Sequence, residues 1–168
     1  MRSRCSMLSI LVFVILGGLG WEPVASAQEA GEFKLPSGAS EGDYFGQSVS
    51  IDGNYAIVGA GQQGGTGAAH IFKLSDNGWV HQQELTASDA EDNDGFGVSV
   101  SISGDHAIVG AYFNKISGIS GSPGSAYLFT RSDDTWTEQK NLIASDAAGG
   151  DQFGLSVSVS AISLAYRV

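Results

Sequence analysis

The sequence predicts an all-β protein built from a repeated unit. One segment recurs three times, as DYFGQSVS at residues 43–50, DGFGVSVS at 94–101 and DQFGLSVS at 151–158. Its β-branched residues alternate with serine, which is the period-2 pattern of strands. No window beyond residue 27 shows a sustained helical period. Repetition at this spacing predicts an architecture of stacked structural units.

The N-terminus predicts export. Arg2 and Arg4 precede an apolar run over residues 7–19, and residues 25–27 form the small-x-small pattern of a cleavage site. We therefore expect residues 1–27 to be a helical signal peptide and the protein to be secreted, whether extracellular, at the cell surface or periplasmic. An uncleaved membrane anchor is the alternative, but a spanning helix needs about 20 apolar residues. No stable membrane span is expected after cleavage.

The composition excludes several classes of partner. The chain carries 18 acidic and 8 basic side chains, for a net charge of −10. Such a surface repels nucleic acid and anionic lipid and leaves cationic partners or divalent ions open. The only cysteine, Cys5, lies in the predicted signal peptide, so we expect no disulfide in the exported part.

The repeat extends well beyond the short segment. Phe45 matches Phe96, 51 positions later, whereas Trp79 matches Trp136 at a spacing of 57. The change in spacing falls in one place, where residues 61–66 correspond to the longer stretch 112–123. Insertions confined to a Gly/Ser-rich loop, with no slip in the flanking strands, are typical of a structural repeat.

Each unit contains four strand-like runs, so the sequence predicts β-propeller blades of four antiparallel strands. A sandwich would not need this duplication, and a solenoid would have a shorter period. After Ser160 the pattern stops, which leaves about two blades plus the start of a third. We expect an N-terminal segment at 28–42 whose residues 32–35 resemble a ring-closing fourth strand. The units then span 43–93, 94–150 and, in part, 151–168; the runs are 45–51, 55–60, 68–74 and 79–86, then 96–102, 106–111, 125–130 and 136–143.

Two short motifs give the repeat a family resemblance. Phe-Gly begins the first strand at 45–46, 96–97 and 153–154, and Val-Gly-Ala ends the second at 58–60 and 109–111. These residues resemble the FG-GAP repeat, the unit of the integrin α-subunit propeller, which also recurs in many exported bacterial proteins. The resemblance covers residues 31–160 and implies a propeller that acts in surface adhesion or protein interaction.

The calcium loop of integrin-type repeats is not matched. Between the first two strands this chain has only the short turns 52–54 and 103–105. Calcium takes 6–8 oxygen ligands, which such turns cannot supply. We therefore predict no cofactor and no metal-binding residue, because the shortened hairpins do not support Ca²⁺.

A second acidic cluster is a looser metal candidate. It consists of Asp89, Asp92 and Asp94, of which the third copy retains the counterparts Asp146 and Asp151 but has Gly149 in place of Asp92. We interpret the recurring aspartates as turn caps that accept backbone hydrogen bonds.

No residue set predicts catalysis. His70, His81 and His106 fall on different strands and none recurs in the other copy, so we predict surface or packing positions. Asp133 and Asp134 lie in a turn that repeats, which indicates solvated carboxylates. Trp79 and Trp136 occupy equivalent strand positions, and their repetition favours the core over sugar stacking. We predict that the chain is not an enzyme and has no catalytic or cofactor-binding residue.

The sequence therefore predicts an exported, non-enzymatic surface adhesion or protein-interaction segment with an unknown protein or glycan ligand. The loops 61–66 and 112–123 would form its variable recognition surface. The alternatives are a fragment of a larger propeller enzyme acting on polysaccharide and a truncated product without independent function. In an incomplete propeller, open blade edges would also allow self-association.

Overall fold

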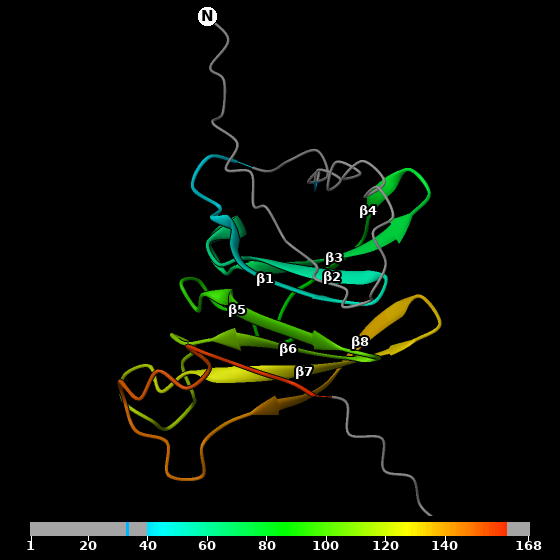
Figure 1. Cartoon of the computed structure of the whole chain (residues 1–168). Helices are drawn as coiled ribbons and strands as arrows, with labels where there is room; N and C mark the ends of the chain where they lie inside the picture. The colour runs from blue at the N-terminus through cyan, green and yellow to red at the C-terminus, as the bar shows by residue number, and fades with distance from the viewer. Residues whose placement is uncertain (1–32, 34–39, 161–168) are drawn as a thin grey trace, which may run out of the picture.

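The computed structural model describes residues 33 and 40–160, which form two stacked four-stranded antiparallel sheets (Figure 1). The all-β class and the four-stranded blades are thereby confirmed, and the predicted signal helix lies outside the described residues. In each blade the strands follow chain order in space. Blade 1 contains β1 (Phe45–Asp52), β2 (Tyr55–Ala60), β3 (Ala68–Ser75) and β4 (Gly78–Leu85). Blade 2 contains β5 (Phe96–Ser103), β6 (His106–Ala111), β7 (Ser125–Ser132) and β8 (Thr135–Leu142).

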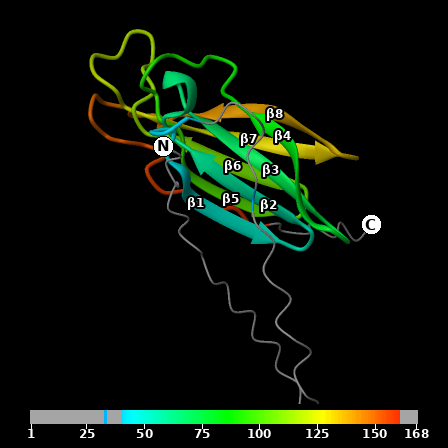
Figure 2. The same ribbon diagram turned by 90° about the horizontal axis from the view of Figure 1, so that it is seen from above.

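The connections divide the molecule into two ends. Two-residue turns at 53–54, 76–77, 104–105 and 133–134 lie at what we call the hairpin end. The longer connections 61–67, 86–95, 112–124 and 143–152 gather at the opposite end, which we call the loop end (Figure 1). A short 3-10 turn, η1 (Gln63–Gly65), lies in the first of these loops. Seen from above, blade 1 lies over blade 2 (Figure 2).

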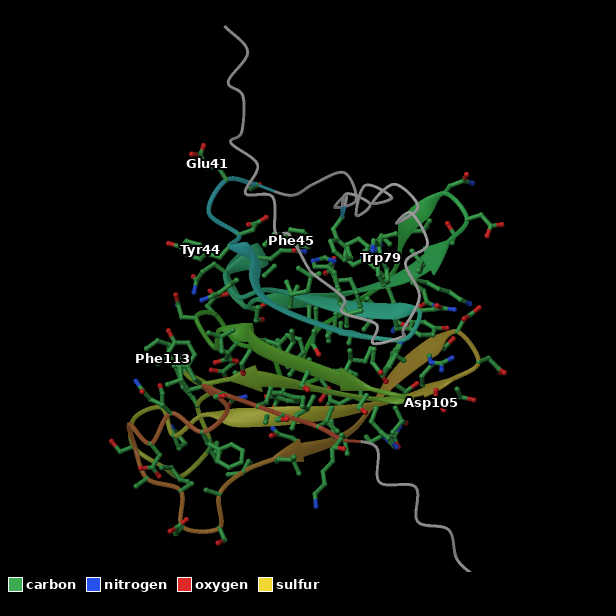
Figure 3. The ribbon with its side chains drawn as sticks, viewed as in Figure 1. Glu41, Tyr44, Phe45, Trp79, Asp105 and Phe113 are labelled. Carbon is green, nitrogen blue, oxygen red and sulfur yellow. The ribbon has the colours of Figure 1, made fainter. Side chains whose placement is uncertain are left out.

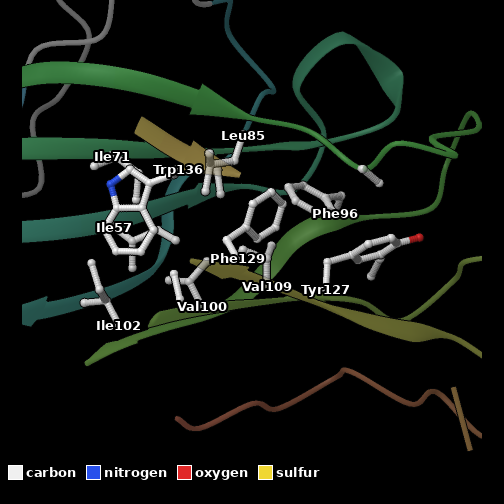
Figure 4. Close-up of a cluster of buried hydrophobic side chains, with 14 residues drawn as sticks. Ile57, Ile71, Leu85, Phe96, Val100, Ile102, Val109, Tyr127, Phe129 and Trp136 are labelled. Atoms are coloured by element: carbon white, nitrogen blue, oxygen red, sulfur yellow. The ribbon is translucent and has the colours of Figure 1, made fainter. Parts of the chain in front are cut away.

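The main core lies between the two blades (Figure 4). Blade 1 contributes side chains from β2, β3 and β4, and blade 2 contributes side chains from all four of its strands. Burying one large apolar side chain stabilises a fold by roughly 1.5–3 kcal/mol, so this layer holds the blades together. Its large members are Ile57, Ile71 and Leu85 from blade 1 and Phe96, Val100, Ile102, Val109, Tyr127, Phe129 and Trp136 from blade 2.

The repeated Phe-Gly and Val-Gly-Ala motifs meet where blade 2 packs on blade 1. A Cβ added to Gly59 would lie 1.9 Å from the carbonyl oxygen of Gly97, and a Cβ added to Gly97 would lie 2.1 Å from that of Ala68. The Ser48 hydroxyl donates to the Gly97 carbonyl at 2.9 Å. Ile102 N–H in turn donates to Ser50 Oγ at 3.1 Å. The small face of the first strand therefore lets two backbones approach closely, and we call this contact the seam.

The same seam forms again on the far side of blade 2. Residues 151–160 lie along that blade, where Ser99 donates to the carbonyl of Gly154 at 2.7 Å. Val159 N–H donates to Ser101 Oγ at 3.1 Å. This segment is not paired into a sheet, because no second strand of a third blade lies beside it in the described residues. It is the start of a third blade, as predicted.

The first strand of each blade departs from the strict alternation that we expected. Phe96, Val100 and Ile102 are buried, but Val98, which we placed on the same face, is only half-buried. The pairing with β6 shifts between Phe96 and Ser99. Gly97 has a φ of +95°, which interrupts the period-2 geometry. The Phe-Gly motif is thus a bulge that begins the strand.

A smaller apolar cluster covers the outer face of blade 1. Ala56, Val58 and Phe72 are buried there, and Phe33 packs against them. The Phe33 ring lies 5.0 Å from Phe72 and 5.2 Å from Trp79, measured between centroids. Both tryptophans therefore pack against apolar clusters, as predicted.

Candidate functional site

The loop end carries the least repetitive part of the described chain. The loop between β2 and β3 and its counterpart between β6 and β7 differ in length and sequence, whereas the flanking strands match. Phe113 is 42% exposed and Tyr44 is 63% exposed, and both lie at this end (Figure 3). The Tyr112 and Phe113 rings contact each other with centroids 4.0 Å apart. Exposed aromatic rings beside carboxylates give this surface its chemical character.

A buried histidine anchors the loop of blade 1. His70 is fully buried on β3, and its Nε2 lies 2.7 Å from Gln63 Oε1 in η1. Because an amide oxygen only accepts hydrogen bonds, His70 Nε2 carries the proton and donates. The amide nitrogen of Gln63 donates to Glu84 at 3.1 Å. The side chains of β3 and β4 thus hold the loop in place.

The second histidine completes this arrangement. His81 Nε2 lies 3.0 Å from His70 Nδ1, which is left as an acceptor, so His81 donates. The contact depends on a bulge, since the pairing of β3 with β4 shifts between Ile71 and Phe72. Sequence analysis placed these histidines on separate strands and missed their contact, because a bulge on β4 leaves no mark in the spacing. Burial, the prediction for such residues, holds for His70.

Burial also determines the protonation of the pair. Desolvation lowers the pKa of His70, with the nearby charge of Glu84 opposing it, His81 lowering it further and Asp43 raising it. Desolvation likewise lowers the pKa of His81, again opposed by Glu84. The neutral pair therefore persists to lower pH than free histidine, which keeps the hydrogen bonds to the loop intact.

Blade 2 anchors its longer loop at the same position with different chemistry. Tyr127 corresponds to His70, is fully buried, and accepts a hydrogen bond from Asn114 in the loop. Its hydroxyl donates to Asp89 at 2.7 Å. Asn141 donates to the same carboxylate at 3.0 Å. Burial and then the Asp89 hydrogen bond raise the pKa of Tyr127 well above its usual range, so the phenol stays protonated.

The recurring aspartates cap turns. The carboxylates of Asp43, Asp94 and Asp151 each accept a backbone N–H from three residues earlier, and each of these bonds measures 2.7 Å. The predicted role is thereby confirmed for Asp94 and Asp151. Asp89 differs, since it serves the Tyr127 anchor. Burial raises the pKa of Asp94 despite its hydrogen bond to the Glu91 N–H.

The looser metal candidate does not gather into a site. Within residues 33 and 40–160, no group of three or more histidine, cysteine, aspartate or glutamate side chains could hold a metal ion. Asp89 and Asp94 are instead held by the anchor and the cap described above, and Asp92 is exposed.

The remaining candidates lie at the hairpin end. Asp134 accepts a hydrogen bond from Lys73 at 2.6 Å and one from the Tyr55 hydroxyl at 3.0 Å. These bonds, the Lys73 bond first, lower the pKa of Asp134. It is therefore an ion-pair partner that links the two blades. His106 is exposed at the start of β6 and lies far along the sheet from the histidine pair.

Comparison with known proteins agrees with this architecture. The family model described as the FG-GAP repeat matches residues 35–72, 79–129 and 136–164. A search of curated proteins found no match. In the part of the chain that the structure describes, no helix is long and apolar enough to cross a membrane. The matched segments cover most of the chain, and the motifs of the repeat form the seams between blades. The chain belongs to the FG-GAP repeat family.

Proposed function

We propose that this chain is an exported, non-enzymatic interaction protein whose loop end recognises a protein or glycan, in an adhesive role. The supporting observation is the contrast between constant seams and divergent loops. Residues of the seam recur in each copy, whereas the loops at 61–66 and 112–123 share neither length nor sequence. A scaffold that repeats while its loops diverge is the usual design of recognition surfaces.

The family supports the non-enzymatic and extracellular parts of this proposal. FG-GAP repeats suggest a β-propeller-like interaction module and are typically non-enzymatic and extracellular. The positively charged, apolar and small-residue stretches at the N-terminus add support for export.

The chemistry of the loop end supports a ligand with hydrogen-bond donors. Phe113 is exposed beside carboxylates that include Glu91 and Asp92. Aromatic rings supply contact area at low entropic cost, and carboxylates accept hydrogen bonds from hydroxyl or ammonium groups. Lys115, which lies 3.6 Å from Glu91, is a cation beside this acidic surface.

A loop exchange tests the proposal. Residues 112–123 are replaced by the shorter segment 61–66, and the product is applied to a glycan array and to immobilised extracellular-matrix proteins, with and without Ca²⁺. We expect every probe bound by the unaltered chain to bind at least roughly tenfold more weakly, because few residues dominate most interfaces. The matched control replaces the turn 133–134 by 76–77 at the hairpin end and should bind normally. Binding that survives the loop exchange would refute the proposal, as would an unaltered chain that binds no probe.

A further inference from the structure

Blade 1 holds its Phe-Gly motif in docking shape with no surface beneath it. Gly46 has a φ of +87°, close to the +95° of Gly97 and the +88° of Gly154. A Cβ added to Gly97 or Gly154 would lie 2.1 Å from a carbonyl oxygen of the preceding blade. A Cβ added to Gly46 meets nothing within 4 Å among the described residues. The same backbone is therefore present in three places but packed in two.

The apolar face behind this motif is uncovered as well. Val49 is 38% exposed and Ile51 is 41% exposed, whereas their counterparts Val100 and Ile102 are 8% and 4% exposed in the seam. These β1 side chains have the shape and chemistry of the β5 side chains that blade 1 covers. We call β1, with this face, the free first strand.

Blade 2 presents the complementary surface. Its Ile108, Leu128 and Leu142 correspond to Ile57, Ile71 and Leu85, which are buried where blade 1 meets blade 2. The three blade 2 residues are only half-buried. Residues 151–160 cover part of this face but leave Phe153 37% and Leu155 51% exposed. We call the half-covered surface the far face.

The free first strand and the far face are thus the two halves of an interface that the molecule already contains once. We propose that the chain associates head to tail with a second copy, whose β1 takes the place of residues 151–160 on blade 2. By equivalence with the existing seam, Ser99 donates to the Gly46 carbonyl of the second copy, and Ser101 accepts its Ile51 N–H. The bonds lost are few, namely those from Ser99 and to Ser101 and one from Phe153 N–H to Pro123 at 2.8 Å.

The geometry limits the size of the assembly. A head-to-tail contact uses two different surfaces, so it either closes into a ring or grows into a fibre. Propellers close with typically 4–8 blades. Two blades per copy therefore give rings of about two to four copies. This assembly is independent of the proposed recognition by the loops, and the loop exchange should leave it unchanged.

Sedimentation velocity of the purified full chain, over a hundredfold range of concentration, tests the association. We expect one discrete species of about two to four copies. The double variant Val49→Asp/Ile51→Asp should weaken association on the order of 100-fold, because two carboxylates would be desolvated in the seam. Val80→Asp is the matched control: Val80 and its counterpart Thr137 both stay exposed, so this position lies outside the seam. A chain that remains monomeric throughout would overturn the proposal.

Mixing distinguishes head-to-tail from symmetric association. The variant Ile108→Asp/Leu128→Asp blocks the far face, and Val49→Asp/Ile51→Asp blocks the free first strand. Each should be monomeric alone, and an equimolar mixture should form a one-to-one complex, because one intact copy of each surface remains. A mixture that stays monomeric, or a blocked variant that still associates, would overturn the proposal. Circular dichroism confirms folding, and Val49→Ser/Ile51→Ser replaces the first pair if the aspartates unfold it.

Discussion

Blade 1 and blade 2 share their strands, turns and seam motifs, yet equivalent side chains have different surroundings. Phe96 is fully buried, whereas Phe45 is half-buried and Phe153 is exposed. The sequence around all three is nearly the same. The burial of a residue in this fold is therefore set by the neighbouring blade rather than by its own strand, as expected when each repeat contacts only the repeats beside it.

The blades also differ in what anchors their loops. At equivalent positions His70 binds Gln63, whereas Tyr127 binds Asn114 and Asp89. Both solutions satisfy a polar group that is buried under a loop, which the fold requires because an unpaired buried polar group is costly. The position is constrained and the chemistry is not, so loops of different length can be held on one scaffold.

The largest predicted effect tests the role of the neighbouring blade. Phe96→Ala should lower the free energy of unfolding by about 3–5 kcal/mol, the usual cost of truncating a buried aromatic residue. Phe45→Ala should cost clearly less, and Phe153→Ala less than about 1 kcal/mol, in line with their exposure. Urea unfolding at a concentration where the chain is monomeric measures all three. Equal losses at the three positions would contradict the comparison.

A second comparison separates close packing from backbone strain. Gly97→Ala and Gly46→Ala both place a side chain at positive φ, which costs about 1–3 kcal/mol. Only Gly97→Ala also drives a Cβ into the Ala68 carbonyl. It should therefore lose an additional ~1–3 kcal/mol from overpacking, again measured by urea unfolding. If the two variants were equally stable, the seam would not be close-packed.

Repetition made the fold predictable, and non-repetition hid the site. The strands and turns follow from alternating residues and from Gly53-type turns that occur in both copies. The capping role of Asp94 and Asp151 also followed, because a short side chain in a turn has few other partners. The His70–His81 contact did not, since it depends on a bulge in one blade and on a glutamine in a loop without a counterpart. The bulge at Gly97 was hidden as well, because Val98 fits the alternating pattern.

The loop anchors should be separable from the fold. Tyr127→Phe removes the hydroxyl that joins Asn114 to Asp89, and it leaves the buried Asn114 amide without this partner. We expect a loss of about 1–2 kcal/mol and faster hydrogen exchange in residues 112–124, with little change in blade 1. Thr130→Val, on the same strand outside this network, is the control. Uniform loss of protection across both blades would show that Tyr127 supports the whole fold rather than the loop.

The smallest predicted effect uses the difference in anchor chemistry, because only the blade 1 anchor titrates near neutral pH. Burial lowers the pKa of His70 and His81 in the folded chain, so below about pH 6.5 the unfolded chain binds more protons. Stability should therefore fall as pH drops from 7.5 to about 5.5, with the melting temperature decreasing by a few degrees. His81→Gln, which can still donate to His70, should flatten this slope, whereas His106→Gln, at an exposed position, should not. The raised pKa of Asp94 acts in the opposite direction, since protonating that buried carboxyl favours the folded chain, and it does so at more acidic pH. An unchanged slope in His81→Gln would place the pH dependence outside the histidine pair.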